Sequence, residues 1–206
     1  ASSHALDIQL PGVRETRAVY VGSFDDRFGS DALSAAALRL PEINFILIGP
    51  GSDRAAMNMK MSNITPLGPI AYSKLPAILA QCSVGLLPLS THAANAGRSP
   101  MKLYEYAAAG LTVAATATPE LSRRVLSTLS LSENDLGYEA AVRRAFRQAA
   151  DTALVELGRQ EAGRESWASK TTHLLDLLQD GRPRGLAVHE QSHAYVADPR
   201  SLEEQG

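Results

Sequence analysis

Lys102 and Glu105 are the two side chains in this sequence whose types and spacing best suit chemistry on an anionic ligand. Residues three apart share one face of a helix. A lysine in the first turn opposes the helix dipole, and lysine before glutamate is the weaker order for an ion pair within a helix. A phosphate beyond the helix start would explain the lysine, and Glu105 can accept hydrogen bonds from a ribose diol. The alternative is an ordinary amphipathic helix whose charges face water.

The segment 99–110, SPMKLYEYAAAG, carries both the start and the stop signals of a helix. Ser99 suits the N-cap, Pro100 suits the first helical position, and Gly110 suits the end. Because this helix follows a predicted strand, we expect its N-terminus to face the ligand-binding edge of a sheet. There the free N–H groups, the Ser99 hydroxyl and the Lys102 ammonium would converge on a phosphate.

Short apolar runs alternate with helical segments through the central part of the chain. The predicted strands, apolar on both faces, lie at 18–21, 45–48, 63–67, 84–89 and 111–116. Predicted helices lie at 31–40, 72–81 and 99–109. Parallel strands joined by right-handed helical crossovers form an α/β, Rossmann-like doubly wound sheet, which is the expected fold class.

Beyond residue 121 the strand signal fades and helices are expected. The segment 138–157 predicts one long amphipathic helix, and the segment 166–178 predicts a last helix. The apolar face of the long helix comprises Val142, Phe146, Ala149 and Ala153. For the domain organisation we expect a linker at 1–16, a ligand-binding domain at 17–180 and a polar, flexible tail at 181–206.

Composition and charge narrow the class of protein. The chain has 206 residues, of which 45% are hydrophobic, enough for one domain with its own core. Its net charge of −2 and the lack of a long basic run argue against a nucleic-acid partner. Cys82 is the single cysteine, which favours the reducing cytoplasm. The sequence contains no apolar run long enough for a transmembrane helix and no signal-peptide pattern at residues 1–12.

Three predicted strands end in glycine, at Gly22, Gly49 and Gly68. Ligands of an open parallel sheet bind beyond the carboxyl ends of its strands, and glycine lets a ligand approach the backbone closely. Three glycines at one edge therefore favour a site, although each can also simply turn the chain. The Gly-Pro-Gly turn at 49–51 lacks the third glycine of a dinucleotide fingerprint.

Four runs together resemble the C-terminal, donor-binding half of GT-B fold glycosyltransferases. They are AVYVGSF at 18–24, PEINFILIGPG at 41–51, NITPLGPIAYSKLPAILAQCSVGLLPL at 63–89 and SPMKLYEYAAAGLTVAATATPEL at 99–121. The resemblance covers about residues 18–180, and it is greatest to bacterial enzymes of polysaccharide and glucuronic-acid transfer. It implies a nucleotide-sugar donor, expected to be a UDP-sugar, and a hydroxyl acceptor.

The resemblance implies a role for each matching residue. Lys102 would neutralise the donor diphosphate, Glu105 would bind the ribose hydroxyls, and the backbone from Gly68 to Ile70 would flank the base. The donor-binding residues expected on this ground, together with the strand-end glycines and the helix cap, are Gly22, Ser23, Gly49, Gly68, Ile70, Tyr72, Ser99, Lys102 and Glu105.

One departure from the family concerns the sugar. Many retaining relatives carry a second glutamate at the position that is Gly97 here, which puts a retaining mechanism in doubt. His92, Asn95 and Arg98 lie in the same loop and can contact the sugar or a carboxylate on it; the alternative is a mobile surface loop. The pair Asp25-Asp26 is expected to serve a helix start. Without an Asp-x-Asp motif, a site with neither metal nor cofactor is expected.

A GT-B enzyme has a second, N-terminal domain that binds the acceptor, and no sequence for it is recognisable here. We therefore expect that domain as a partner, with the catalytic residues on it. Cytoplasmic localisation is expected, and peripheral attachment of the full enzyme to the inner face of the membrane is compatible with lipid-linked acceptors. Two alternatives stay open: a non-catalytic binding module for nucleotides or sugar phosphates, and a nucleotide-sugar epimerase.

The segment from His189 to His193 reads HEQSH and matches the zinc motif H-E-x-x-H. Zinc binding by this motif requires a helix, and this copy lies in a polar stretch bounded by Pro183 and Pro199. A chance match or stray metal binding is therefore the favoured interpretation over a metalloprotease.

Overall fold

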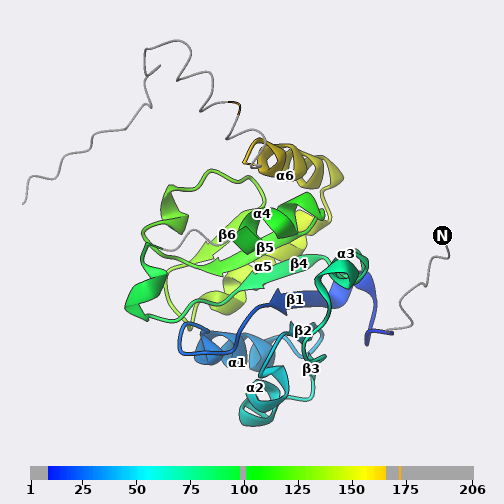
Figure 1. Cartoon of the computed structure of the whole chain (residues 1–206), viewed down its shortest axis with the longest axis vertical. Helices are drawn as coiled ribbons and strands as arrows, with labels where there is room; N and C mark the ends of the chain where they lie inside the picture. Colours follow the sequence, from blue (N-terminus) through cyan, green and yellow to red (C-terminus); the bar gives the residue numbers. More distant parts are fainter. Residues whose placement is uncertain (1–8, 98–100, 166–171, 173–206) are drawn as a thin grey trace, which may run out of the picture.

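The chain forms a parallel sheet of six strands in a computed structural model that describes residues 9–97, 101–165 and 172. The strands are β1 (Arg17–Val21), β2 (Asn44–Ile48), β3 (Ile64–Pro66), β4 (Val84–Leu87), β5 (Thr112–Thr116) and β6 (Leu129–Ser132). Their order across the sheet is β3-β2-β1-β4-β5-β6, and every adjacent pair is parallel (Figure 1). The order reverses between β1 and β4, so a crevice is expected beyond the carboxyl ends of these two strands.

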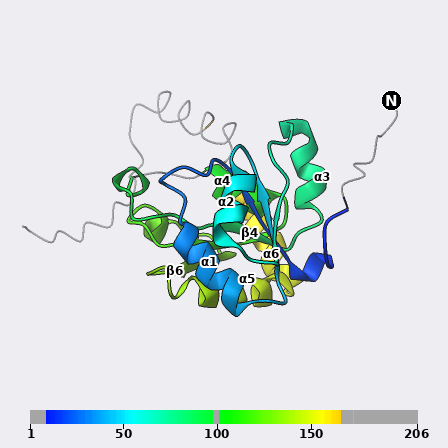
Figure 2. The same ribbon diagram turned by 90° about the horizontal axis from the view of Figure 1, so that it is seen from below.

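Within the described residues, six α-helices cover the two faces of the sheet. They are α1 (Ser30–Arg39), α2 (Ser52–Met59), α3 (Leu75–Leu79), α4 (Met101–Ala108), α5 (Tyr138–Ala149) and α6 (Thr152–Arg164). The apolar residues of α1, α2 and α5 pack on one face, and those of α3, α4 and α6 pack on the other. Figure 2 shows α1 and α5 together on one side of the sheet. Successive strand residues alternate between the two cores, as Ala18 and Val19 do on β1.

The sheet and helix pattern confirms the α/β, Rossmann-like class, but it differs from the expectation in three elements. β6 was not predicted, because its sequence LSLS is short and half polar. Buried Ser130 and Ser132 are tolerated there because their hydroxyls donate to Gln148 Oε1 and the Asn134 carbonyl, at 2.8 and 2.7 Å. α2 was not predicted either; its sequence, SDRAAMNM, is too short and polar for a clear helical pattern.

The prediction of a single helix at 138–157 is wrong, because the segment forms α5 and α6 with a break at Ala150 and Asp151. Asp151 is extended, with φ −92° and ψ 100°, and its carboxylate accepts the N–H groups of Ala153 and Leu154. Ala153 is therefore an exposed N-terminal residue of α6 and does not continue the apolar face of α5. The helix predicted at 166–178 and the tail at 181–206 lie outside the described residues, apart from Thr172.

α4 is anchored beneath the end of β1 by one buried tyrosine. The Tyr106 side chain is fully buried, and its hydroxyl oxygen accepts the backbone N–H of Val21 at 2.8 Å. Its ring lies on Gly85 of β4, where a Cβ would meet the ring carbons at 2.3 Å. Burial raises the pKa of Tyr106 well above its usual value, so the hydroxyl stays neutral. This contact sets the position of α4 relative to β1 and β4.

Within the parts of the chain that the structure describes, no helix combines the length and apolarity needed to cross a membrane.

Candidate functional site

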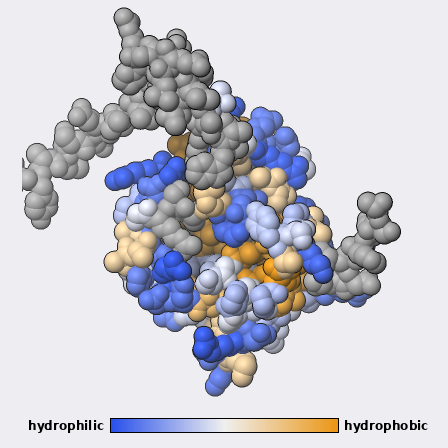
Figure 3. Space-filling model, viewed as in Figure 1, coloured by the Kyte–Doolittle hydropathy of each residue, from blue (hydrophilic) through white to orange (hydrophobic). Residues whose placement is uncertain are grey.

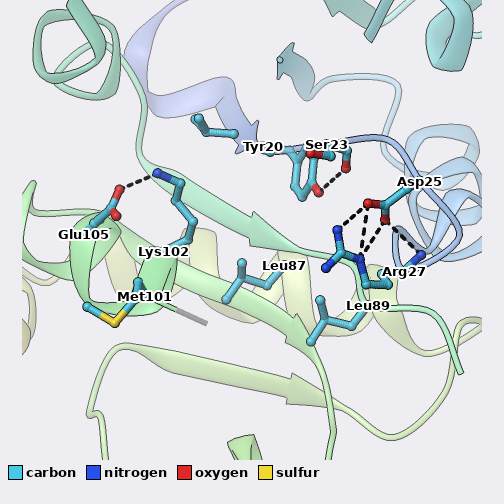
Figure 4. Close-up of a pocket in the computed structure, with 11 residues that line it drawn as sticks. Tyr20, Ser23, Asp25, Arg27, Leu87, Leu89, Met101, Lys102 and Glu105 are labelled. Carbon is cyan, nitrogen blue, oxygen red and sulfur yellow. Dashed lines mark hydrogen bonds and ion pairs between the residues drawn. The ribbon is translucent and has the colours of Figure 1, made fainter. Parts of the chain in front are cut away.

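A pocket of about 370 Å³ lies beyond the carboxyl ends of β1 and β4, where the strand order reverses. It is lined by residues from the end of β1, the loop after it, the end of β4 and the first turns of α4 (Figure 4). The lining residues are Tyr20, Val21, Gly22, Ser23, Asp25, Arg27, Leu87, Leu89, Met101, Lys102 and Glu105. The topology alone predicts a ligand at this point.

Lys102 and Glu105 meet at one end of this pocket. The Lys102 ammonium lies 2.5 Å from Glu105 Oε2, and the two side chains are 28% and 33% exposed. The Lys102 Nζ also lies 5.7 Å from the centroid of the Tyr72 ring, which is within the range of a cation–π contact. Lys102 thus has a partner in its own helix, contrary to the prediction from residue order. Its position in the pocket wall is what indicates a ligand.

Two small residues directly after β1 form part of the pocket wall. Gly22 and Ser23 both line the pocket, and the Tyr20 hydroxyl donates to the Ser23 carbonyl at 2.8 Å. The rings of Tyr20, Phe24 and Phe28 pack against one another with centroids 4.9 to 5.1 Å apart. This aromatic cluster packs the loop after β1 against the core on one face of the sheet.

The three strand-end glycines are adjacent, but only Gly22 lines the pocket. Gly22 N–H donates to the Ile48 carbonyl at 3.0 Å, and Gly49 N–H donates to the Gly68 carbonyl at 2.9 Å. Gly68 N–H in turn donates to the buried Ser52 hydroxyl at 3.0 Å. Gly49 and Gly68 therefore join strand ends, and the structure does not place them around the pocket.

Tyr72 lies beside Lys102, and Ile70 precedes Tyr72 in the chain by two residues. Tyr72 is 71% exposed and lines a second, mostly apolar groove of about 320 Å³ between α3 and α4. Glu105 lines this groove as well as the first pocket, so the two cavities share a wall. Ile70 is half-buried and packs against the core on that face. Figure 3 shows apolar side chains gathered over the sheet between α3 and α4.

Asp25 and Arg27 line the pocket, although the sequence analysis did not include them among the site residues. Arg27 Nε lies 3.1 and 3.2 Å from the two Asp25 carboxylate oxygens, and Nη2 also contacts Oδ2. The hydrogen bond and charge of Asp25 raise the pKa of Arg27 above its usual value. α1 begins only at Ser30, so the assignment of Asp25 to a helix start is wrong. In the sequence, the signal that could have identified these two residues is an aspartate and an arginine two positions apart in the loop after a predicted strand.

His92 and Asn95 hold two loops together and do not line the pocket. Asn95 is buried, and its Nδ2 donates to the carbonyls of Arg27 and Ser90 at 3.0 and 2.9 Å. His92 Nε2 lies 3.3 Å from an Asp26 carboxylate oxygen, and its Nδ1 accepts the Ala94 N–H. The loop after β4 is thereby fastened to the loop after β1.

Arg98 and Ser99, which were expected to contact the sugar and to cap α4, lie outside the described residues, as does the HEQSH segment. Among the residues that the structure does describe, no three His, Cys, Asp or Glu side chains gather as metal ligands.

Two solved structures have a fold similar to that of this chain. Sucrose-phosphate synthase from Thermosynechococcus elongatus matches with a TM-score of 0.62 and 20% identity, over 81% of this chain and 46% of that one. AviGT4, a glycosyltransferase involved in avilamycin A biosynthesis, matches with a TM-score of 0.62 and 18% identity, over 82% of this chain and 53% of that one. At these identities, the likeness establishes the fold alone.

The amino-acid sequence is also similar to that of a glycosyltransferase. A candidate teichuronic acid biosynthesis glycosyltransferase of Bacillus subtilis, TuaH, is 22% identical over 155 residues, which cover 72% of this chain and 39% of that protein. The chain thus spans about half the length, or less, of the proteins that it matches. Residues 15–154, more than half of the chain, match the family described as Glycosyl transferases group 1. The chain therefore belongs to the group 1 glycosyltransferase family.

Proposed function

We propose that this chain is the donor-binding half of a GT-B glycosyltransferase and that it binds a UDP-sugar by its diphosphate. The observation that carries the proposal is the position of Lys102 in a pocket at the switch point between β1 and β4, opposite the backbone of Gly22. A cation at this edge, in the first turn of α4, matches a ligand with two linked phosphoryl groups.

The ion pair leaves Lys102 able to bind a phosphate. An ammonium group has three N–H donors, and one of them accounts for the contact with Glu105. The remaining donors can reach phosphate oxygens while Lys102 holds the Glu105 carboxylate in place for the ribose hydroxyls. The uridine would extend past Glu105 toward Tyr72 and the backbone from Gly68 to Ile70, because the second cavity begins there.

In the proposed reaction, an acceptor hydroxyl attacks the anomeric carbon of the donor sugar. A new C–O bond forms, the bond between the anomeric carbon and the diphosphate breaks, and the electron pair leaves with UDP. Lys102 and the N-terminal end of α4 stabilise the charge that develops on the leaving diphosphate. The acceptor and the base that takes its proton belong to the proposed N-terminal domain, and no metal or cofactor is part of the proposal.

The comparisons support the proposal at the level of the family and the fold. One solved structure of similar fold, HepE of Anabaena, is a complex with UDP and glucose; it matches with a TM-score of 0.58 and 13% identity, over 81% of this chain and 49% of that chain. The share of each relative that this chain covers leaves room for an N-terminal domain. By analogy with TuaH, we propose a role in polysaccharide biosynthesis in the cytoplasm, with the full enzyme at the inner face of the membrane.

Calorimetry with UDP, UMP and uridine tests the proposal, with Lys102→Ala as the variant. We expect UDP to bind the unsubstituted chain most tightly, and Lys102→Ala to weaken UDP binding by roughly thirtyfold, since a hydrogen bond to a charged group contributes about 2 kcal/mol. Uridine binding should change little. Lys74→Ala is the matched control, because Lys74 is exposed and lines neither cavity. Equal affinities for all three ligands would refute the diphosphate assignment.

A further inference from the structure

A second ion pair, formed by Asp25 and Arg27, lies at the end of the pocket opposite Lys102. Both side chains come from the loop between β1 and α1, and both line the pocket. Figure 4 shows this pair on the far side of Leu87 from Lys102 and Glu105. The pocket therefore has one cation and one carboxylate at each end.

The side-chain charges that line the pocket cancel one another. Its described lining residues include two cations, Lys102 and Arg27, and two carboxylates, Asp25 and Glu105. Each cation is already in contact with one of the carboxylates. A donor diphosphate at Lys102 adds negative charge to this site. Among the described residues, no lining cation without a carboxylate partner remains to neutralise a further anionic group.

The Asp25–Arg27 pair presents both acceptors and donors to a ligand. The Asp25 carboxylate accepts from the Arg27 backbone N–H and Nε, both 3.1 Å from Oδ1, and from Nη2. Nη1 has no hydrogen-bond partner among the residues that the structure describes. Each of the two side chains is 38% exposed. A sugar hydroxyl is both a donor and an acceptor, so it can donate to Asp25 and accept from Arg27.

The loop that carries this pair is fastened from behind. The Arg27 carbonyl accepts hydrogen bonds from Ser90 N–H and Asn95 Nδ2, both at 3.0 Å. The Asn95 side chain is buried. Because the backbone and the ion pair are already held, a ligand orders few torsions when it binds, and the pair is preorganised for recognition.

The direction of the donor determines which part of it meets Asp25 and Arg27. In the proposed function, the diphosphate lies at Lys102 and the nucleoside extends toward Tyr72. The diphosphate joins the nucleoside to the sugar, so the sugar extends along the pocket toward the opposite end. A carboxylate on that sugar would lie beside the Asp25 carboxylate. Since Arg27 is already paired with Asp25, the repulsion between the two anions is not offset.

We propose that Asp25 is a specificity-determining residue, which accepts a hydroxyl of the donor sugar and repels a sugar that carries a carboxylate. The donor is then a neutral sugar, although the sequence resembles enzymes of glucuronic-acid transfer. This inference rests on the proposed function, because it requires the diphosphate at Lys102.

Calorimetry of the 206-residue chain with UDP, UDP-glucose and UDP-glucuronate tests the inference. The two sugars differ only in the group outside the ring, which is a neutral alcohol in one and a carboxylate in the other. The unsubstituted chain should bind UDP-glucose at least about tenfold more tightly than UDP-glucuronate, because like charges brought together weaken binding.

Asp25→Asn should reduce this preference to less than about threefold, because the amide keeps an acceptor oxygen and leaves Arg27 able to bind a sugar carboxylate. The affinity of this variant for UDP should change by less than about threefold, since its diphosphate lies at the other end of the pocket. Circular dichroism melting of each variant confirms that it folds.

Asp26→Asn is the matched control. It removes the same charge from the neighbouring position in the same loop, but the Asp26 side chain is 73% exposed and does not line the pocket. This variant should keep the preference of the unsubstituted chain for UDP-glucose.

Different failures have different meanings. If the unsubstituted chain binds UDP-glucuronate as tightly as UDP-glucose, the inference is overturned and the proposed function stands, provided that UDP binding depends on Lys102. An unchanged preference in Asp25→Asn also overturns it, and so does an equal change in Asp26→Asn, because the pocket-facing carboxylate would then not be the cause. If UDP does not bind at all, the proposed function itself fails and the inference fails with it.

Discussion

At the scale of single residues, the glycines at the strand ends differ in what they do. Gly22 lines the pocket, whereas Gly49 packs against the backbone of Gly22. Gly49 has φ +137°, and a Cβ there would lie 1.9 Å from the Gly22 carbonyl oxygen. A side chain at Gly49 would therefore displace the wall of the pocket as well as strain its own backbone.

We expect Gly49→Ala to lower the free energy of unfolding by about 3 kcal/mol, because positive-φ strain and a backbone clash add together. Urea denaturation followed by circular dichroism measures this change. Gly97→Ala is the control: among the described residues, no atom lies within 4 Å of a Cβ at Gly97, so its stability should change by less than about 0.5 kcal/mol. Equal stabilities of the two variants would contradict the account of Gly49.

Residue chemistry singled out Lys102 and Glu105 correctly as neighbours, and the pocket contains both. The same reasoning overlooked Arg27, because an arginine close to two aspartates in a loop has the pattern of a solvated surface pair. The role of Arg27 depends on the pocket that it shares with Lys102. Lys102 is on α4, which is more than 70 residues away in the sequence.

At the scale of elements, the junction between α5 and α6 shows how one side chain divides a helical segment. Asp151 accepts two backbone N–H groups of the first turn of α6, at 3.0 and 3.1 Å. These hydrogen bonds require Asp151 to be extended, so α5 must end before it. The break lets α6 leave the α5 face and pack beside α4, which carries Lys102.

Substitutions of Asp151 test its role as the N-cap of α6. We expect Asp151→Ala to lower the free energy of unfolding by about 1 kcal/mol, the usual effect of losing an aspartate N-cap. Asp151→Asn should retain most of the stability, since an amide oxygen accepts the same N–H groups. Thermal melting of both variants gives the comparison. If Asn proved as destabilising as Ala, the hydrogen bonds at the cap would not be the cause.

At the scale of the whole molecule, the two cores on either face of the sheet exclude water from groups far from the site. Cys82 is fully buried two residues before β4, and its thiol donates to the Ile78 carbonyl at 3.6 Å. Burial raises the pKa of Cys82 from 9.0 to about 12, against a smaller opposing effect of Arg17 and Arg14. The folded protein thus keeps this thiol neutral at a pH where the unfolded chain ionises it.

This shift predicts a loss of stability at alkaline pH. The neutral thiol's contribution is complete below pH 9 and is lost as the pH rises from 9 toward 12, because the unfolded state releases its proton first. At pH 10 the loss attributable to Cys82 should be about 1.4 kcal/mol. Urea denaturation at pH 8 and pH 10 measures it, and Cys82→Ala should remove that part of the pH dependence. Tyr106 and Tyr138, whose pKa values are also raised by burial, contribute mainly above pH 10.

Local sequence was sufficient for most of the secondary structure. The five predicted strands and the three helices predicted before residue 110 are present because buried parallel strands read as short apolar runs, and because the order of strands and helices admits few folds. β6 escaped prediction because its buried side chains are serines, whose burial depends on partners in α5 and the following loop.

The sequence by itself determined the alternation of strands and helices, the glycines at the strand ends and the two charged residues of α4. Only the tertiary structure decided that β1 lies beside β4, which places Gly22 in the pocket, leaves Gly49 and Gly68 outside it, and brings Arg27 across from Lys102. The reason is physical: the side-chain pattern of a strand specifies which faces are buried, whereas its neighbours in the sheet depend on packing between segments distant in the chain.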